Sequence, residues 1–312
     1  MNFLKSFFAS ILGTLTALGL FFVIVLLFIS GIASIMSAPS GGNSIKQNSV
    51  LALDLNLPIV DRAPSFDELQ ILLGLEDKVL GLPDIISAID KASENQNIKG
   101  IRLRADFISA GWAQTRSIRN ALSRFKESGK FIYAYADVFT QKGYYLASIS
   151  DSIYLNPVGI LEFKGLASEV LYYKDFQDEY GVKMEVIRHG KYKSAVEPYL
   201  ENEMSSDNRY QIKTLLDDIW KTIREEIAQE RNLDPKILDK IINNQRITIP
   251  EDGVQEHLID ALVYEDDFDE KIKMQLEIST DEDLNRVSVV DVNNASSTFD
   301  SSLKDRIAIV FA

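Results

Sequence analysis

The stretch IKGIRLRADFISAGWAQTRSIRNALSRFKESGKFIYAYA, Ile98–Ala136, decides the fold class of this chain. Its first residues alternate apolar and basic side chains, which is typical of a β-strand. From Trp112 to Ser128 the apolar residues recur at helical spacing, and Gly129 then supplies a C-terminal stop. The aromatic run Phe131–Ala136 predicts a second strand. A strand, a helix and a strand in this order predict an α/β fold with a mainly parallel sheet.

Strand-like and helix-like segments continue on both sides of this stretch. The apolar run Ser49–Leu55 predicts a strand, and Asp77–Asn95 predicts a helix whose regular part begins at Pro83. Helical spacing is clearest in Asn208–Glu230, whose apolar stripe we expect to be buried: Ile212, Leu215, Leu216, Ile219, Ile223 and Ile227. The remaining predicted elements are helices at Gly143–Ser150, Val170–Tyr180, Pro235–Asn243 and Pro250–Leu258, and strands at Ser152–Leu155 and Val182–Arg188.

The composition argues against several functional classes. The chain has 312 residues and a formal net charge of −13, which argues against a nucleic-acid partner because phosphate binding needs clustered Lys and Arg. It has no cysteine, which excludes disulfides, thiol catalysis and Cys-ligated metal sites. With only His189 and His257, a multi-histidine metal site is not expected. We interpret the acidic run Glu265–Glu270 as the solvated start of a helix, and we expect no metal and no cofactor.

The N-terminal part is a long apolar segment. Phe7–Met36 is mostly apolar and carries no charge, and a bilayer core needs roughly twenty such residues in a helix. The apolar part of a cleaved signal peptide is about 7–15 residues long, so an uncleaved anchor is favoured over cleavage near Ser37. Lys5 precedes the segment and the next basic residue is Lys46. By the positive-inside rule, the N-terminus lies in the cytoplasm and the rest of the chain lies outside.

The last residues repeat an earlier pattern. Arg306–Ala312 (RIAIVFA) echoes the apolar run Ser49–Leu55, and the chain stops inside this apparent strand. A repeated start of this kind favours a duplicated protein. The sequence therefore predicts a chain truncated at the start of a second repeat, with the polar stretch Thr280–Ser302 as a linker before it.

The segment Gly190–Tyr199 (GKYKSAVEPY) is the candidate for chemistry. It follows the predicted strand Val182–Arg188, and open α/β sheets place active groups at the carboxyl ends of their strands. Lysine is protonated at pH 7 with a free pKa of about 10.4, but desolvation lowers that pKa and lets the amine accept a proton from a serine hydroxyl. From spacing alone, Lys191 and Lys193 are better explained as solvated surface charges than as catalytic groups.

A resemblance favours the catalytic interpretation. Tyr192–Pro198 (YKSAVEP) closely resembles the lysine motif of the long-form signal peptide peptidase A family, also called protease IV. NIKGIRLRA at Asn97–Ala105, FTQKGYYLAS at Phe139–Ser148 and DSIYLNPVG at Asp151–Gly159 are also similar to stretches of that family. The resemblance implies that Lys193 is the general base of a Ser–Lys dyad. It also implies a crotonase-like fold related to ClpP, a spiral of ββα units.

The nucleophile is expected outside this chain. In the family it lies in the second repeat, in a Ser-Gly-Gly-Tyr stretch that opens a helix. The equivalent position of this first repeat is Gln141, whose amide cannot attack a peptide carbonyl. Phe107–Gly111 is the expected counterpart of the family's Gly-rich oxyanion loop, although it is not Gly-rich. Glu197 either positions the lysine segment or is a surface charge, and we do not expect Ser194 or His189 to be catalytic.

The resemblance implies a membrane-anchored serine endopeptidase that degrades cleaved signal peptides and other hydrophobic peptides. It would lie in a bacterial cytoplasmic (inner) membrane, in contact with lipid, with its catalytic domain on the outer, periplasmic side. A homo-oligomer, in the form of a tetramer, is expected. The alternatives are a noncatalytic crotonase-fold membrane scaffold and a crotonase-type acyl-CoA enzyme. The expected organisation is a cytoplasmic N-terminus (1–6), a transmembrane anchor (7–36), a linker (37–48), a first crotonase-like peptidase repeat (49–279), a second linker (280–304) and the start of a second repeat (305–312).

Overall fold

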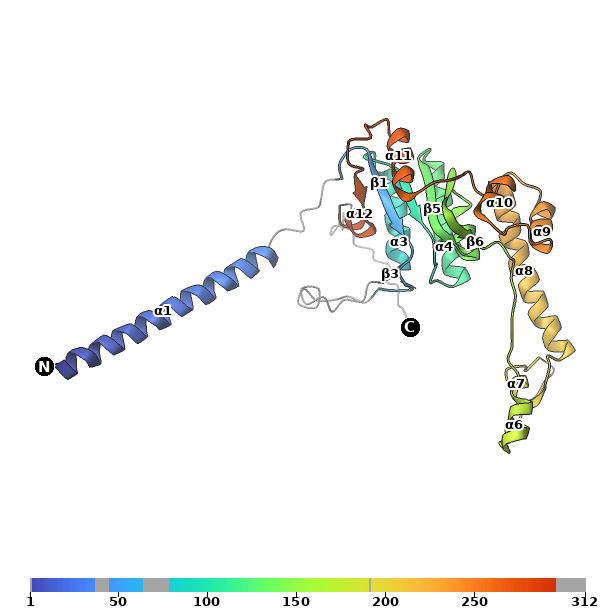
Figure 1. Ribbon diagram of the computed structural model, residues 1–312, viewed down its shortest axis with the longest axis horizontal. Helices are drawn as coiled ribbons and strands as arrows, with labels where there is room; N and C mark the ends of the chain where they lie inside the picture. Colours follow the sequence, from blue (N-terminus) through green and yellow to red (C-terminus); the bar gives the residue numbers. More distant parts are fainter. Residues whose placement is uncertain (1, 37–44, 64–78, 191, 296–312) are drawn as a thin grey trace, which may run out of the picture.

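The computed structural model describes residues 2–36, 45–63, 79–190 and 192–295 (Figure 1). Its centre is a six-stranded sheet in the order β7-β6-β5-β4-β1-β8, in which every neighbouring pair is parallel. The strands are β1 (Ser49–Asp54), β4 (Ile98–Arg104), β5 (Phe131–Phe139), β6 (Ser152–Leu161), β7 (Ala261–Leu262) and β8 (Arg286–Val287). The prediction of an α/β fold with a parallel sheet is confirmed.

Helices cover both faces of the sheet, as parallel sheets require. One face packs against α3 (Leu82–Glu94), α4 (Trp112–Glu127) and α5 (Gln141–Ala147), together with the C-terminal part of α8 (Ser206–Glu230). The other face packs against α11 (Glu265–Gln275), where the Tyr135 and Phe268 rings stack at 5.2 Å between centroids. Two short strands, β2 (Ile59–Val60) and β3 (Leu80–Gly81), pair separately.

The predicted helix boundaries hold where capping signals are strong. α3 begins at Leu82 with Pro83 in its first turn, and α4 spans nearly the predicted residues and is followed by Gly129 at φ +77°. α9 (Pro235–Asn243) begins where Asp234 accepts a hydrogen bond from the Lys236 N–H at 2.8 Å. α10 (Pro250–Gln255) follows it.

The N-terminal half of α8 extends beyond the sheet (Figure 1). Of its predicted buried stripe, only Ile223 and Ile227 are buried, whereas Leu215 is 59% exposed. At its far end lie α6 (Lys174–Tyr180) and α7 (Glu197–Leu200), in a segment that we call the arm, residues 166–205. The prediction of a fully buried stripe is therefore wrong, because the described elements leave the stripe around Leu215 uncovered.

The predicted strand Val182–Arg188 is not formed. The described residues of the arm contain no strand, and Val182, Met184 and Ile187 are exposed. A strand exists only through backbone pairing with a neighbour, and this part of the arm lies away from the sheet (Figure 1). The expectation that the lysine segment follows a strand is therefore wrong.

Part of the expected linker 280–304 belongs to the domain. β8 pairs with β1, and α12 (Val289–Ala295) packs beside α3, where Ser87 donates a hydrogen bond to Asn293 at 2.9 Å. Val289 and Val292 are buried in the core. The predicted start of a second repeat, 305–312, lies outside the described residues.

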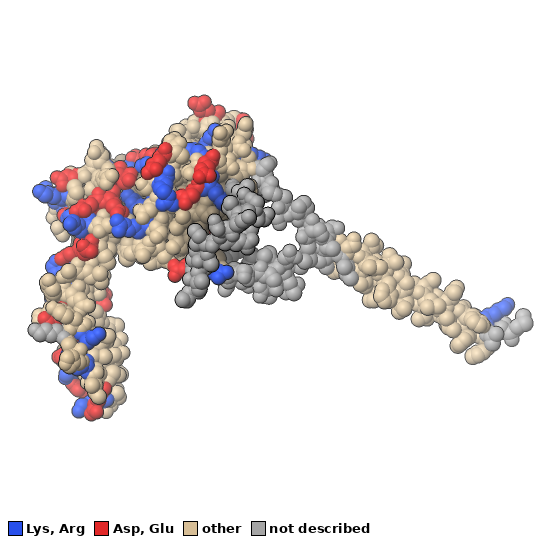
Figure 2. Space-filling view, turned by 180° about the vertical axis from the view of Figure 1, so that it is seen from behind, with Lys and Arg blue, Asp and Glu red and all other residues tan. Residues whose placement is uncertain are grey.

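The N-terminal helix α1 (Asn2–Met36) is long and apolar enough to cross a membrane. Its stretch Lys5–Phe28 has a mean hydropathy of 2.7, and none of its most apolar window is buried. In the space-filling view its surface is uncharged except near its far end (Figure 2). The chain thus has one N-terminal helix that could serve as a membrane anchor.

Candidate active site

The carboxyl edge of the sheet is organised by Asp106, which lies two residues after the end of β4. Its buried carboxylate accepts hydrogen bonds from the backbone N–H of Asp137 at 2.8 Å and from the Asn56 amide at 3.1 Å. Asn56 in turn accepts from the N–H groups of Asp106 and Phe107. These contacts fix the start of Phe107–Gly111, the loop expected to correspond to the oxyanion loop.

The N-terminus of α5 packs directly against this loop. Thr140 caps the helix, accepting from the Gly143 N–H at 3.2 Å and donating to the Asp106 carbonyl at 3.0 Å. A Cβ on Gly143 would lie 2.2 Å from the carbonyl oxygen of Ala105, so only glycine allows this approach. Lys142 donates to the Ala110 carbonyl at 2.7 Å. The structure therefore brings together the two segments that the resemblance associates with the nucleophile and the oxyanion loop.

Gln141 stands at the position expected for a nucleophile. Its side chain instead binds the backbone just after β6. Its side-chain oxygen accepts hydrogen bonds from the backbone N–H groups of Lys164 and Gly165, each at 3.0 Å. Its side-chain nitrogen is buried and has no partner among the described residues. Gly165 has φ +80°, and the chain leaves the domain there to enter the arm. This position carries a structural contact, and its amide offers no nucleophile.

Lys193 is exposed in the arm. It lines a cavity of about 480 Å³ that is formed by residues 186–189 and 192–196. The carbonyl oxygen of Lys193 accepts a hydrogen bond from the Arg188 guanidinium at 3.3 Å. The desolvation that a lysine base needs is therefore not supplied by the described residues. Lys191 lies outside them.

The other candidate residues of this segment take different places. His189 is exposed, and half-buried Ser194 opens the turn into α7, its carbonyl accepting from the Glu197 N–H at 3.0 Å. Tyr144 and Tyr145 are buried core residues. The Tyr144 hydroxyl donates to the Leu258 carbonyl at 2.8 Å, and burial raises the pKa of this phenol.

Glu197 is a buried anchor of the lysine segment. The residue is 1% exposed, and its carboxylate accepts hydrogen bonds from the Ser205 hydroxyl at 2.6 Å and the Asn208 amide at 2.9 Å. Burial alone would raise the pKa of this carboxyl, but these hydrogen bonds and nearby Arg188 lower it below its usual value. Of the two interpretations of Glu197, the structure excludes the surface charge.

The acidic start of α11 is part of an ion-pair network. Glu265 pairs with Arg102 at 2.8 Å and with Arg104 at 2.7 Å, and Asp269 pairs with Arg102 at 2.7 Å. The two arginines lie on β4 and are mostly buried, so the network attaches α11 to the sheet. In the sequence, the signal for this network is the basic residues that alternate with apolar ones in β4. Among the described residues no cluster of carboxylates or histidines could hold a metal ion.

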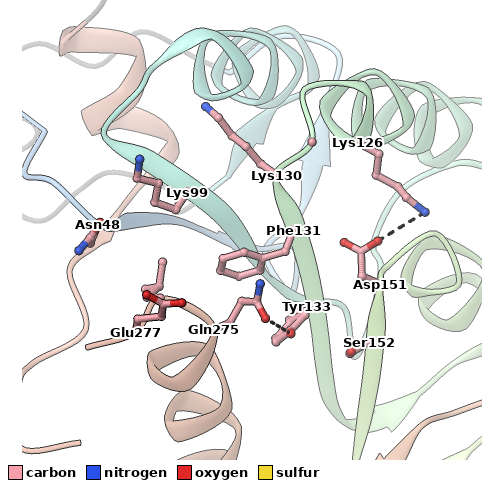
Figure 3. A pocket seen from close by; sticks show the side chains of 12 residues that line it. Asn48, Lys99, Lys126, Lys130, Phe131, Tyr133, Asp151, Ser152, Gln275 and Glu277 are labelled. Atoms are coloured by element: carbon pink, nitrogen blue, oxygen red, sulfur yellow. Dashed lines mark hydrogen bonds and ion pairs between the residues drawn. The ribbon is translucent and has the colours of Figure 1, made fainter. Parts of the chain in front are cut away.

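A separate pocket of about 600 Å³ lies at the opposite, amino-terminal edge of the strands (Figure 3). Lys99, Lys130, Phe131 and Tyr133 line it, and Tyr133 donates to Gln275 at 3.0 Å. Burial and the like charge of Lys99 lower the pKa of Lys130. The pocket contains none of the predicted site residues.

Comparisons with known proteins agree on one family. The model of peptidase family S49 matches residues 124–279, half of the chain, and this range includes Lys193. The chain is 33% identical over 233 residues to Protease 4 of Haemophilus influenzae, covering 72% of this chain and 37% of that protein. It is 26% identical over 273 residues to the chloroplastic serine protease SPPA of Arabidopsis thaliana, covering 86% of this chain and 38% of that protein. The chain therefore spans less than two fifths of the length of these relatives.

Among solved structures, a mutant of the 1510-N membrane-bound stomatin-specific protease matches with a TM-score of 0.41 and 11% sequence identity, over 77% of this chain and 97% of that chain.

Proposed function

Because the chain belongs to peptidase family S49, we propose that it is the membrane-anchored, lysine-bearing part of a serine endopeptidase that works through a Ser–Lys dyad. The observation that carries this proposal is the place of Lys193. It lies inside the region that matches the family, within a segment resembling the family's lysine motif, and it is presented on the arm. Gln141 stands at the position expected for a nucleophile, so the serine is expected beyond residue 312.

The proposed mechanism needs a neutral lysine. The Lys193 amine takes the proton of the serine hydroxyl as the serine oxygen attacks the peptide carbonyl, and it then gives this proton to the leaving amine. Backbone N–H groups stabilise the negative charge on the carbonyl oxygen. Since Lys193 is exposed in the described part of the chain, the apolar cover that lowers the pKa of a lysine base comes from another part of the protein or from a second copy.

The substrates we propose are cleaved signal peptides and other hydrophobic peptides in extended form. Exposed apolar side chains of the arm, including Leu171, Val182 and Ile187, support an apolar substrate or an apolar partner surface. The partner surface fits a homo-oligomer, in the form of a tetramer. Helix α1 supports anchoring in the bacterial inner membrane, with the N-terminus inside and the domain on the outer, periplasmic side.

The other two functions carry less support. A crotonase-type acyl-CoA enzyme is disfavoured by membership of a peptidase family. A noncatalytic membrane scaffold would keep the fold without using Lys193. Loss of the Lys193 amine would leave a scaffold unaffected, whereas it would inactivate a Ser–Lys peptidase.

The test uses the full-length protein that contains this chain and a fluorogenic hydrophobic peptide. Lys193→Ala is expected to lower the rate by about 10²–10⁴-fold or more, the range of general acid–base catalysis. Lys193→Arg is expected to be as inactive because guanidinium stays protonated. Lys191→Ala serves as the matched control and should have a mild effect, with circular dichroism confirming folding. A folded Lys193→Arg protein that keeps most of its activity would rule out the Ser–Lys mechanism.

A further inference from the structure

The lysine segment is held at its C-terminal side by a buried carboxylate. Glu197 is the first residue of α7, and both of its carboxylate oxygens are occupied. The Ser205 hydroxyl donates to one oxygen at 2.6 Å, and the Asn208 amide donates to the other at 2.9 Å. Asn208 is itself buried. A buried charge with this many donors holds its position closely, because moving it would leave the charge or its donors unpaired.

The donors belong to the N-terminus of α8, the longest helix of the α/β domain. Ser205 is its N-cap and accepts from the Asn208 N–H at 3.2 Å while donating to Glu197. The positive end of the helix dipole also favours a carboxylate there. Glu197 therefore connects the lysine segment to a helix whose other end, at Ile223 and Ile227, is buried in the domain core.

Arg188 extends this connection back to Lys193. Its guanidinium nitrogen Nη1 lies 3.8 Å from a Glu197 carboxylate oxygen and donates to the carbonyl oxygen of Lys193 at 3.3 Å. The Glu197 N–H donates to the Ser194 carbonyl at 3.0 Å, which closes the turn between the two residues. The backbone of Lys193 is thus held from both sides of its own segment.

We infer that Glu197 is a positioning residue: its carboxylate, held by Ser205 and Asn208, sets the place of Lys193 through Arg188 and the Ser194 turn. The inference rests on the proposed function, since Lys193 has to be the base for its position to affect a rate. Glu197 does not touch the substrate or take a proton in this scheme. It acts by restricting the positions that the Lys193 amine can occupy. Misplacement of a reacting group by about 1 Å costs on the order of 10²-fold in rate.

The test compares Glu197→Gln with Glu201→Gln in the full-length protein. Glutamine keeps the size of the side chain, but only one of its two terminal atoms accepts hydrogen bonds and it has no charge to attract Arg188. Glu201 is exposed and four residues further on, so the same substitution there controls for the loss of a charge. We expect kcat on the fluorogenic hydrophobic peptide to fall about 10–10²-fold for Glu197→Gln, with KM within about twofold, and no change for Glu201→Gln.

A second pair of variants keeps the inference testable if Glu197→Gln does not fold. Arg188→Gln changes a partly exposed side chain, and Arg209→Gln is its exposed control. We expect Arg188→Gln to lower kcat about 10-fold with an unchanged thermal midpoint, because it removes one of the two links to Lys193. In the double variant Glu197→Gln/Arg188→Gln, the decrease in kcat should be smaller than the two single effects combined. Both substitutions disrupt the same set of contacts that holds Lys193.

The outcomes separate the two proposals. If Glu197→Gln folds and only its thermal midpoint falls while kcat stays at the wild-type value, Glu197 is structural and the inference is wrong. A change confined to KM would also overturn it. If Lys193→Ala retains activity, the proposed function fails, whatever the Glu197 variants show.

Discussion

The hydroxyl of Ser205 donates a hydrogen bond of 2.6 Å to the buried carboxylate of Glu197 while capping the N-terminus of α8. One side chain thus serves both the helix and the lysine segment. In the sequence the two residues stand apart, one in the segment KYKSAVEPY and the other at the start of a helix. Their contact attaches the lysine segment to the helix rather than to the sheet.

Ser205→Ala should destabilise the arm by about 1–2 kcal/mol. The substitution removes an N-cap, which costs about 0.5–2 kcal/mol, and it leaves a buried carboxylate with one donor fewer. Hydrogen exchange of residues 192–208 measures the effect. Ser206→Ala, on the exposed neighbour within the helix, is the control and should leave exchange unchanged. Equal exchange in the two variants would show that the bond to Glu197 does not order the arm.

Gly143→Ala should destabilise the domain by about 1–3 kcal/mol. The new methyl group would lie 2.2 Å from the Ala105 carbonyl oxygen, so α5 or the Phe107–Gly111 loop would have to move. Gly111→Ala is the control, because its nearest atom would be 3.7 Å away and its φ of −68° suits alanine. Urea denaturation of both variants measures the difference. Similar midpoints would mean that the close approach at Gly143 is not tight in solution.

Gln141→Ala should loosen the junction between β6 and the arm. The backbone N–H groups of Lys164 and Gly165 would lose their acceptor, so their hydrogen exchange should become faster. Gln141→Glu keeps an acceptor oxygen at the same distance along the side chain and should restore slow exchange at these two residues. Fast exchange in Gln141→Glu as well would show that the acceptor oxygen is not what protects these two N–H groups.

Acid should weaken the attachment of α11 through Glu265. Burial opposes ionisation of this carboxyl, but hydrogen bonds from Arg102 and Arg104 lower its pKa below the ordinary value of 4.5. A depressed pKa in the folded state means that the stabilisation is complete well above pH 4.5. It is lost as the pH falls below 4.5 and through the lower folded-state pKa.

Urea midpoints measured between pH 7 and pH 3 check this dependence. Glu265→Gln removes the titrating group, so its stability should change less over the acid range than that of the wild-type protein. Asp266→Asn, at the exposed next position, should follow the wild-type curve. Parallel curves for Glu265→Gln and the wild-type protein would exclude Glu265 as a source of the acid sensitivity.

Local patterns in the sequence determined much of the fold. The spacing of Ile118, Ala121, Leu122 and Phe125 predicted the buried face of α4, and all four side chains are buried. Asp234 and Pro235 predicted the start of α9, and the apolar N-terminal segment predicted α1. These features depend on neighbouring residues: a cap binds the next turn, and a periodic apolar face forms within a single helix.

The candidate site was predicted only in part. The segment Tyr192–Pro198 is recognisable as a sequence, and Lys193 could be named from it. Its setting could not, because the contacts that hold it come from Arg188 and from the start of α8, and neither is marked by a pattern within the segment. Glu197 illustrates the difference. The local sequence around it would be the same whether this glutamate were buried or solvated.

Only the tertiary structure decided which apolar faces are covered. Val182–Arg188 has the composition of a strand but has no neighbouring strand, and Leu215 belongs to the apolar stripe of α8 but lies beyond the sheet. Conversely, the polar stretch after Thr280 contains Val289 and Val292, which are buried beside α3. Periodicity records which side of an element is apolar. Burial and strand pairing depend on a second element, distant in the sequence, that arrives only when the chain folds.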